Sequence, residues 1–290
     1  MIKEAQAKAK VLIEALPYLQ SFCRSFIVVK FGGSLMDQEA KVSSILKDIA
    51  LMRQVGLWPV IVHGGGPAIT RAVDAAGLKT ERVAGLRITS PEIMEITQRV
   101  LIDGVSHQLC ARLDKLGAKG IPLNGRGSNF LRCRKKRLVD QPDVDLGLVG
   151  EISSIDVELI RRLCEGGIIP VVAPVAKGPD DRLFNVNADE VAVFVAIAAS
   201  AEKIVFLSDV DGVMDDPKKP DSLYSSLTVD ACEAMIADGR ISGGMIPKIK
   251  ASVAAVREGV KKTHIINGNT EHSLLLEMFT EEGVGTQIML

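Results

Sequence analysis

One stretch near the N-terminus reads Phe26-Ile27-Val28-Val29-Lys30-Phe31-Gly32-Gly33-Ser34. A continuous apolar run of this kind is typical of a strand that is buried on both faces, as in a parallel sheet covered by helices. A lysine at the end of such a strand is costly to bury unless it meets an anion. The two glycines after it let backbone N–H groups approach that anion closely. The stretch therefore predicts an α/β fold with an anion-binding turn after its first strand.

The rest of the chain repeats this alternation of apolar runs and helical patterns, which predicts a largely parallel sheet with helices on both faces. Ligands of such sheets bind beyond the carboxyl ends of the strands. Residues 125–154 are rich in turns and charge and are predicted to form β-hairpins or a flap. The further predicted strands are 58–62, 83–89, 118–123, 168–173, 203–207, 264–266 and 285–289, and the predicted helices are 2–20, 39–54, 67–76, 91–116, 156–164, 188–199, 228–237, 245–258 and 273–279.

Composition excludes several classes of protein. Lys plus Arg is 35 and Asp plus Glu is 36, so there is no excess of basic residues for binding nucleic acid. The five cysteines are scattered and form no CxxC motif, which is cytosolic usage rather than a disulfide framework or a zinc site. The longest apolar run, 191–201, is about half of the roughly 20 residues that span a membrane. These features predict a cytoplasmic protein with no membrane segment and no structural metal.

Two further glycine turns carry candidate anion sites. His63-Gly64-Gly65-Gly66-Pro67 precedes a predicted helix, whose N-terminus attracts negative charge. Gly243-Gly244-Met245-Ile246-Pro247-Lys248 places a second lysine in the first turn of another helix, where a cation is unfavourable without an anionic partner. Either lysine could instead be a solvated side chain, and Lys30 could reach solvent from an edge strand. The chain has no GxxxxGK[ST], GxGxxG, HRD or DFG motif.

Three other side chains could complete a site for phosphoryl transfer. Asp189 follows Asn185-Val186-Asn187-Ala188 where a helix begins; it either favours the helix dipole or holds the two lysines. Arg87 in Gly85-Leu86-Arg87-Ile88-Thr89 is either a surface residue or a bidentate partner for a carboxylate. Asp209 follows an apolar run and either caps a turn or faces a nucleotide and its metal.

The conjunction of these motifs is more specific than any one of them. Read in order, the segments 30–34, 63–67, 85–89, 185–189, 208–213 and 243–248 resemble the amino acid kinase family, and the resemblance covers 26–290. It is nearest to the branch that uses ATP to phosphorylate the γ-carboxylate of N-acetyl-L-glutamate, the second step of arginine biosynthesis. This resemblance implies a three-layer αβα sandwich around a mainly parallel sheet. It also implies an acyl-binding lobe at 23–177 and an ATP-binding lobe at 178–290.

The resemblance also implies roles for single residues. Lys30 and Lys248 would stabilise the transferring phosphoryl group, and Asp189 would organise both lysines. Gly64, Gly65, Arg87 and Asn185 would bind the acyl substrate, with Arg87 on the α-carboxylate of N-acetylglutamate. Gly32, Gly33 and Asp209 would lie on the nucleotide side. Because the nucleophile is already a carboxylate, positioning and charge stabilisation would suffice, with Mg²⁺ entering on ATP.

The predicted N-terminal helix and the C-terminal segment resemble the arginine-inhibited branch of the same family. In that branch a helix corresponding to 1–22 links dimers into a hexamer, so the resemblance implies a homo-oligomer, either a dimer or a hexamer. The helix could equally pack on its own domain. The candidate residues for an L-arginine site are Tyr18, Lys218, His264, Glu277 and Gly283. Glu277 would bind the guanidinium, or it could simply be a solvated helix residue.

Two alternatives remain open at this stage. One is a sister kinase of the aminoadipate branch, and the other is a non-catalytic amino-acid sensor with the same fold. The chain departs from the family pattern at Ala84, where an asparagine is usual before Gly85, at Asn124-Gly125-Arg126-Gly127-Ser128, and in the basic stretch 132–137. These departures fall around the predicted flap and bear on substrate choice more than on reaction type.

Overall fold

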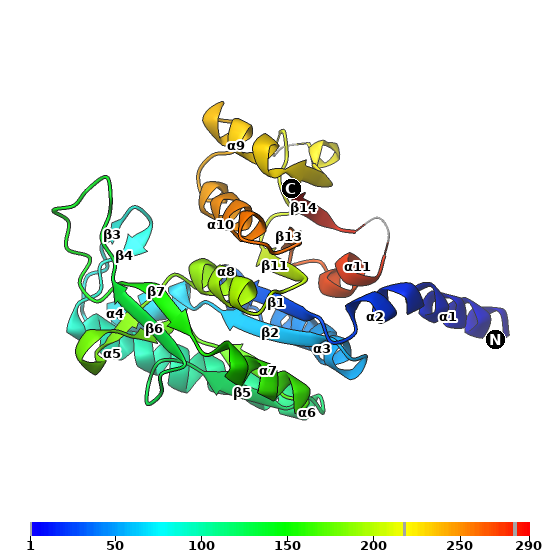
Figure 1. Ribbon diagram of the computed structural model, residues 1–290, viewed down its shortest axis with the longest axis horizontal. Helices are drawn as coiled ribbons and strands as arrows, with labels where there is room; N and C mark the ends of the chain where they lie inside the picture. The colour runs from blue at the N-terminus through cyan, green and yellow to red at the C-terminus, as the bar shows by residue number, and fades with distance from the viewer. Residues whose placement is uncertain (1, 217–218, 281–282) are drawn as a thin grey trace.

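The computed structural model describes residues 2–216, 219–280 and 283–290. Its elements form three layers, with a central sheet between two layers of helices (Figure 1). Within the described ranges the central sheet has eight strands in the order β12-β14-β13-β11-β1-β2-β8-β5. The predicted αβα sandwich is confirmed. The strands are β1 (Phe26–Phe31), β2 (Trp58–His63), β5 (Gly120–Leu123), β8 (Ile169–Val172), β11 (Lys203–Ser208), β12 (Ser226–Thr228), β13 (Lys262–Asn267) and β14 (Gly285–Met289).

The strands from β13 to β5 run parallel, whereas β14 runs antiparallel to β13. In this register Lys30 lies beside Val62 and Phe206, and Phe31 lies beside His63. Ser208 at the end of β11 lies beside Asn267 at the end of β13. The glycine turns that follow β1 and β2 and the loops that follow β11 and β13 therefore meet at one edge of the sheet.

Alternation along β1 decides which helix layer each side chain faces. Ile27, Val29 and Phe31 join the core under α3 (Glu39–Gln54), α6 (His107–Lys115) and α11 (Ser273–Phe279). Val28 joins the opposite core, under α7 (Val157–Glu165), α8 (Ala188–Ala198), α9 (Val229–Ala237) and α10 (Met245–Arg257). Because strand side chains alternate with a period of two, Lys30 points to the same side as Val28, toward α8.

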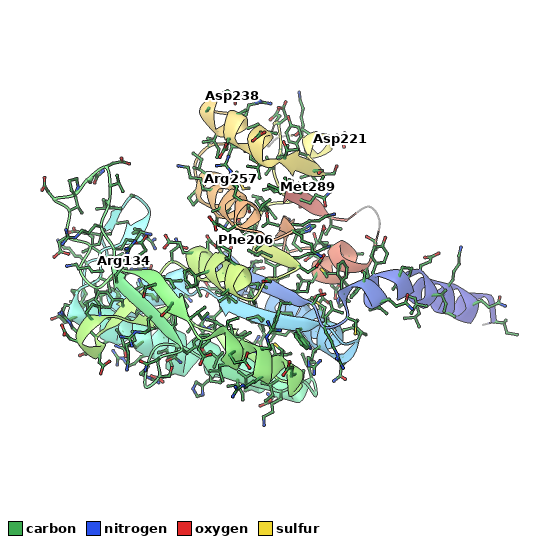
Figure 2. The ribbon with its side chains drawn as sticks, viewed as in Figure 1. Arg134, Phe206, Asp221, Asp238, Arg257 and Met289 are labelled. Carbon is green, nitrogen blue, oxygen red and sulfur yellow. The ribbon has the colours of Figure 1, made fainter. Side chains whose placement is uncertain are left out.

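Outside these three layers, a group of short strands and helices surrounds the carboxyl end of β2. The predicted flap at 125–154 contains β6 and most of β7, which join β9 and β10 in a four-stranded sheet of order β10-β9-β6-β7. Basic side chains of this sheet, such as Arg134, are exposed (Figure 2). These strands are β6 (Leu131–Lys135), β7 (Gly150–Ile155), β9 (Val175–Lys177) and β10 (Leu183–Asn185). The neighbouring elements are η1 (Gly33–Asp37), α4 (Gly66–Ala75), the hairpin β3 (Arg82–Val83) and β4 (Leu86–Arg87), α5 (Pro91–Gln98), the π-helix η2 (Arg99–Ser106) and η3 (Pro179–Asp181). The short helix η4 (Pro220–Ser222) precedes β12, away from these elements.

One predicted strand was wrong in detail. The predicted strand 83–89 is a hairpin, because Ala84 (φ 49°) and Gly85 (φ 79°) adopt the left-handed conformation of a tight turn. The predicted helix 2–20 is divided into α1 (Ile2–Glu14) and α2 (Leu16–Phe22), with Pro17 in the first turn of the second. This break agrees with the sequence, because a proline at this place is expected to kink or end a helix. In the ranges that the structure covers, no helix is both long and apolar enough to cross a membrane.

Candidate active site

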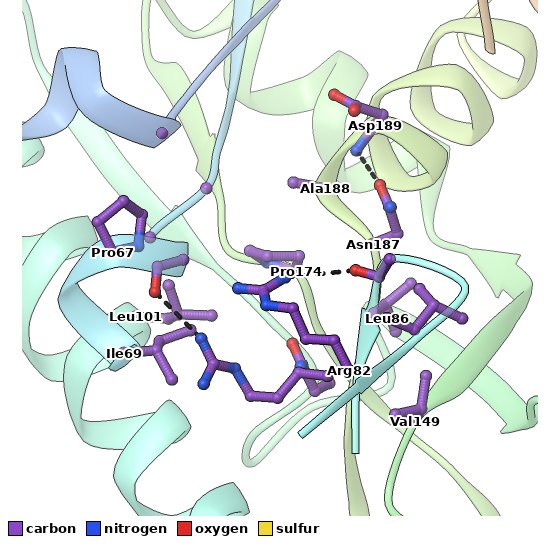
Figure 3. Close-up of a pocket in the computed structure, with 18 of the residues that line it drawn as sticks. Pro67, Ile69, Arg82, Leu86, Leu101, Val149, Pro174, Asn187, Ala188 and Asp189 are labelled. Atoms are coloured by element: carbon purple, nitrogen blue, oxygen red, sulfur yellow. Dashed lines mark hydrogen bonds between the residues drawn. The ribbon is translucent and has the colours of Figure 1, made fainter. Parts of the chain in front are cut away.

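Lys30 and Asp189 meet where the end of β1 faces the start of α8. Lys30 Nζ lies 2.7 Å from Asp189 Oδ1, and the two side chains are 11% and 16% exposed. The helix start is capped by Asn187, whose side-chain oxygen accepts a hydrogen bond from the Asp189 N–H at 2.7 Å (Figure 3). Since Asn187 does the capping, the Asp189 carboxylate is free to bind Lys30.

The second lysine faces the same carboxylate from α10. Burial on its own raises the pKa of the Asp189 carboxyl, but the charges of Lys30 and Lys248 outweigh it and hold that pKa below its usual value. Burial and the charge of Lys30 lower the pKa of Lys248, while Asp189 and Asp209 act to raise it. One carboxylate thus sits among two lysines that repel each other, so the site has spare positive charge for a further anion.

The first two glycine turns are in direct contact. Gly64 N–H donates to the Phe31 carbonyl at 2.9 Å. A Cβ on Gly32 would lie 3.0 Å from the backbone of Gly64, and one on Gly65 would lie 2.4 Å from Leu101 Cδ2. Gly33 takes a φ of 63°. A side chain at Gly32 would push the two turns apart, and one at Gly65 would collide with Leu101, so these glycines keep the N-terminus of α4 beside Lys30.

Lys30 and Asp189 border a cavity of about 290 Å³ that also reaches Gly33, Gly64, Gly65, Asn185 and Arg87 (Figure 3). Arg87 is buried, and its guanidinium donates to Thr80 Oγ1 at 2.8 Å, Thr70 Oγ1 at 2.7 Å and the Gly66 carbonyl at 3.2 Å. Burial, then the nearby charge of Arg82, lowers the pKa of Arg87. The structure thus gathers every predicted acyl-substrate residue in one cavity. We call it the acyl cavity.

A second cavity, of about 530 Å³, lies beside Lys248. It is lined by Asp209, Gly212, Arg240, Lys248 and Asn267, among others. Asp209 is exposed there, at the end of β11. Of the predicted nucleotide-side glycines, Gly33 borders the acyl cavity and Gly32 packs behind Gly64. We call this second space the nucleotide cavity.

A third cavity, of about 390 Å³, brings together Tyr18 of α2 with His264, Glu277 and Gly283 from the C-terminal segment. His264 Nδ1 lies 2.5 Å from Glu277 Oε1, and Glu277 Oε2 accepts a hydrogen bond from Val284 N–H at 3.0 Å. Burial lowers the pKa of His264. Burial acts to raise the pKa of Glu277, but the hydrogen bonds from His264 and Val284 and the nearby charges together outweigh it and hold that pKa below its usual value, so Glu277 is ionised. The fifth predicted residue, Lys218, lies outside the described residues.

Sequence reasoning missed the roles of two residues that the structure places at these cavities, and of a third that is buried nearby. Lys203 is buried in the third cavity with its Nζ 4.8 Å from the centre of the Phe22 ring. Arg82 lines the acyl cavity. His63 is buried behind the glycine turns and bonds to Ser106. A lysine at the start of a buried strand was a usable signal for Lys203, whereas Arg82 gives no signal until the hairpin register is known.

Residues 25–267 match the amino acid kinase family. The chain therefore belongs to this family, and it is a kinase. Among curated proteins, the acetylglutamate kinase of Methanococcus aeolicus is 46% identical over 97% of both chains. The acetylglutamate kinase of Methanocaldococcus jannaschii is 42% identical over 97% of this chain and 96% of that one.

Among solved structures, N-acetylglutamate synthase from Neisseria gonorrhoeae superposes with a TM-score of 0.86 in its complex with coenzyme A and N-acetyl-glutamate. It is 26% identical over 97% of this chain, which spans 63% of the synthase. The same synthase complexed with coenzyme A and L-arginine superposes with a TM-score of 0.82 at 25% identity over 97% of this chain and 65% of that one.

Proposed function

We propose that this kinase transfers the γ-phosphoryl group of ATP to the γ-carboxylate of N-acetyl-L-glutamate, in the pathway to arginine. The observation that carries the proposal is the cluster of Lys30, Asp189 and Lys248 between the acyl and nucleotide cavities. Acetylglutamate kinases that match nearly the full chain support the choice of acyl substrate.

In the proposed step a γ-carboxylate oxygen attacks the γ-phosphorus of ATP. A new oxygen–phosphorus bond forms, the bond between the γ-phosphorus and the β,γ-bridging oxygen breaks, and ADP leaves with the electron pair. No general base is needed because the nucleophile is already ionised. Lys30 on the acyl side and Lys248 on the nucleotide side would hold two anions that repel each other, and Asp189 would fix both ammonium groups.

Mg²⁺ would enter with ATP and neutralise charge on its phosphates, because this ion prefers phosphate oxygens and water to a cage of protein ligands. Asp209 is suited to bind this Mg²⁺, because it is an exposed carboxylate that lines the nucleotide cavity.

We also propose that residues 23–177 form the acyl lobe and 178–290 the ATP lobe. The residues that line the nucleotide cavity all lie between positions 208 and 267, within the proposed ATP lobe. The dispersed cysteines continue to favour a cytoplasmic location.

The mechanism is tested by removing one lysine and keeping its neighbour. Lys248→Ala should lower kcat by about 10²- to 10³-fold, the usual effect of losing a group that stabilises transition-state charge. Lys250→Ala, at an exposed position of the same helix, is the matched control and should keep its activity. Acyl phosphate is measured as the hydroxamate with Mg-ATP and N-acetyl-L-glutamate. Undiminished turnover in Lys248→Ala would reject the mechanism, and turnover restricted to another acyl amino acid would move the substrate to the sister branch.

We further propose that the third cavity binds L-arginine as a feedback inhibitor. A guanidinium suits the ionised, mostly buried Glu277, which already holds a neutral histidine. The solved complex of the related synthase with L-arginine supports this choice of ligand. We also propose that α1 links subunits, because its Ile2, Leu12 and Ile13 side chains are 77%, 72% and 68% exposed.

A further inference from the structure

The hairpin at the mouth of the acyl cavity carries two arginines on one face. In its antiparallel register Arg82 on β3 lies directly opposite Arg87 on β4. Directly opposite residues of an antiparallel pair project to the same side of the ribbon. Both arginines accordingly line the acyl cavity. In Figure 3 the Arg82 side chain reaches from the hairpin into the cavity, toward Pro174.

The two arginines differ in how they are held. Arg87 is buried, and its three hydrogen bonds to Thr70, Thr80 and Gly66 fix its guanidinium in place. Arg82 is exposed at the mouth, and its recorded hydrogen bond is a long one of 3.3 Å to the Gly85 carbonyl. A guanidinium has five N–H donors, so Arg82 can still bind an acceptor bidentately.

Placing two like charges directly opposite each other destabilises a hairpin. The turn adds to this cost, because Ala84 is a non-glycine residue with a φ of 49°. Despite both costs, the register of the hairpin places the two guanidinium groups on one side of a short ribbon. An anion between them would offset the repulsion, whereas a hairpin with a structural role alone would have no need of the second arginine.

The charges that line the cavity match a substrate with two carboxylates. Among the described lining residues the cations are Lys30, Arg82 and Arg87, and the carboxylate is Asp189. Lys30 pairs with Asp189 beside the glycine turns, which leaves the two arginines without a carboxylate in the cavity. N-acetylglutamate is a dianion at neutral pH. With its γ-carboxylate at Lys30, its α-carboxylate needs a cationic partner elsewhere in the cavity.

We propose that Arg82 closes with Arg87 on the α-carboxylate of the acyl substrate, and that Arg82 selects for substrates that carry this group. Arg87 is the fixed half of the clamp and Arg82 the mobile half. This inference rests on the proposed function. It predicts an interaction between the Arg82 side chain and the α-carboxylate that a double-mutant cycle can measure. Removing either group should abolish the effect on kcat/KM of removing the other.

The experiment pairs Arg82→Met with 4-acetamidobutyrate, which is N-acetylglutamate without its α-carboxylate. We expect Arg82→Met to lower kcat/KM for N-acetyl-L-glutamate on the order of tenfold, mainly through KM, as for the loss of a charged hydrogen bond. It should change kcat/KM for 4-acetamidobutyrate by less than about twofold, since the partner group is absent. The KM for ATP should stay unchanged.

The control variant is Arg162→Met, at an exposed arginine of α7 that pairs with Glu158. It should leave all constants unchanged. An equal loss on both substrates, or no loss on N-acetyl-L-glutamate, would overturn the clamp. If the unmodified enzyme does not turn over N-acetyl-L-glutamate, the proposed function fails first, which separates that outcome from failure of the clamp.

Discussion

His63 connects the stability of the active-site turns to pH through one buried side chain. It has no exposed surface, its Nε2 lies 2.7 Å from Ser106 Oγ and its Nδ1 lies 3.1 Å from the Gly64 carbonyl oxygen. Burial lowers its pKa to about 4 from 6.5. Between these values the unfolded chain binds the proton and the folded chain does not. His63 therefore lowers stability as pH falls from 6.5 to 4, and has no such effect above 6.5.

We expect this histidine to cost about 2 kcal/mol of unfolding free energy at pH 5 relative to pH 7. The measurement is urea denaturation at both pH values for the unmodified chain and for His63→Gln, which keeps an amide near the Ser106 hydroxyl. Other groups titrate in both proteins, so the difference between their pH dependences isolates His63. Equal losses of stability would show that His63 does not titrate in this way.

At the scale of an element, Gly283, two residues before β14, shapes the third cavity. Gly283 has a φ of 62°, and a Cβ there would lie 2.9 Å from Glu277 Oε2. Gly283→Ala should displace the Glu277 carboxylate and raise the arginine concentration for half inhibition on the order of tenfold, with kcat unchanged. Gly239→Ala carries the same left-handed strain (φ 83°) with open space around it, and should leave inhibition intact. If both variants lose inhibition equally, general strain and not Glu277 is responsible.

At the scale of the whole molecule, α1 projects from the body toward solvent, while α2 lies beside α11 and joins α1 to the body (Figure 1). Deleting residues 1–22 removes the exposed Ile2, Leu12 and Ile13 and should convert a hexamer into a dimer, as measured by light scattering. Leu12→Glu together with Ile13→Glu should have the same effect without shortening the chain, because charges at an apolar contact oppose burial. A deletion variant that remains hexameric would refute the linking role.

Elements with a strong pattern could be predicted from the sequence almost residue by residue. The bounds of β1, α3 and β14 were predicted correctly, because apolar runs and helical periodicity dominate there. The hairpin at 82–87 could not be, since strands of two residues have no period and Ala84 is not a usual turn residue. The strands β9, β10 and β12 were missed because they have three residues each. The π-helix within 91–116 continues the helical pattern of α5 and α6, so the sequence predicted one helix there.

The candidate site divides in a similar way. Lys30 and the glycine turns follow from local sequence, because a strand end and a helix start fix their position. The contact of Lys30 with Asp189 joins residues far apart in the chain, and it depends on the packing of α8 against β1. Arg82 became visible only when the hairpin register was known, since its partner is set by pairing and not by sequence neighbours. Lys203 could have been noticed as a lysine that begins a buried strand, but its place beside Lys262 depends on register.

β11 and β13 each have one end at the third cavity and the other at the nucleotide cavity. Lys203 and Lys262 are paired at the first end, and Ser208 and Asn267 at the second. Five residue steps of about 3.3 Å separate the two ends by roughly 17 Å. Each of these strands is hydrogen-bonded to a neighbouring strand on both sides, so its length is fixed. If binding at one cavity affects the other along this route, it must therefore do so by a rigid-body tilt or shift of whole strands and not by their stretching.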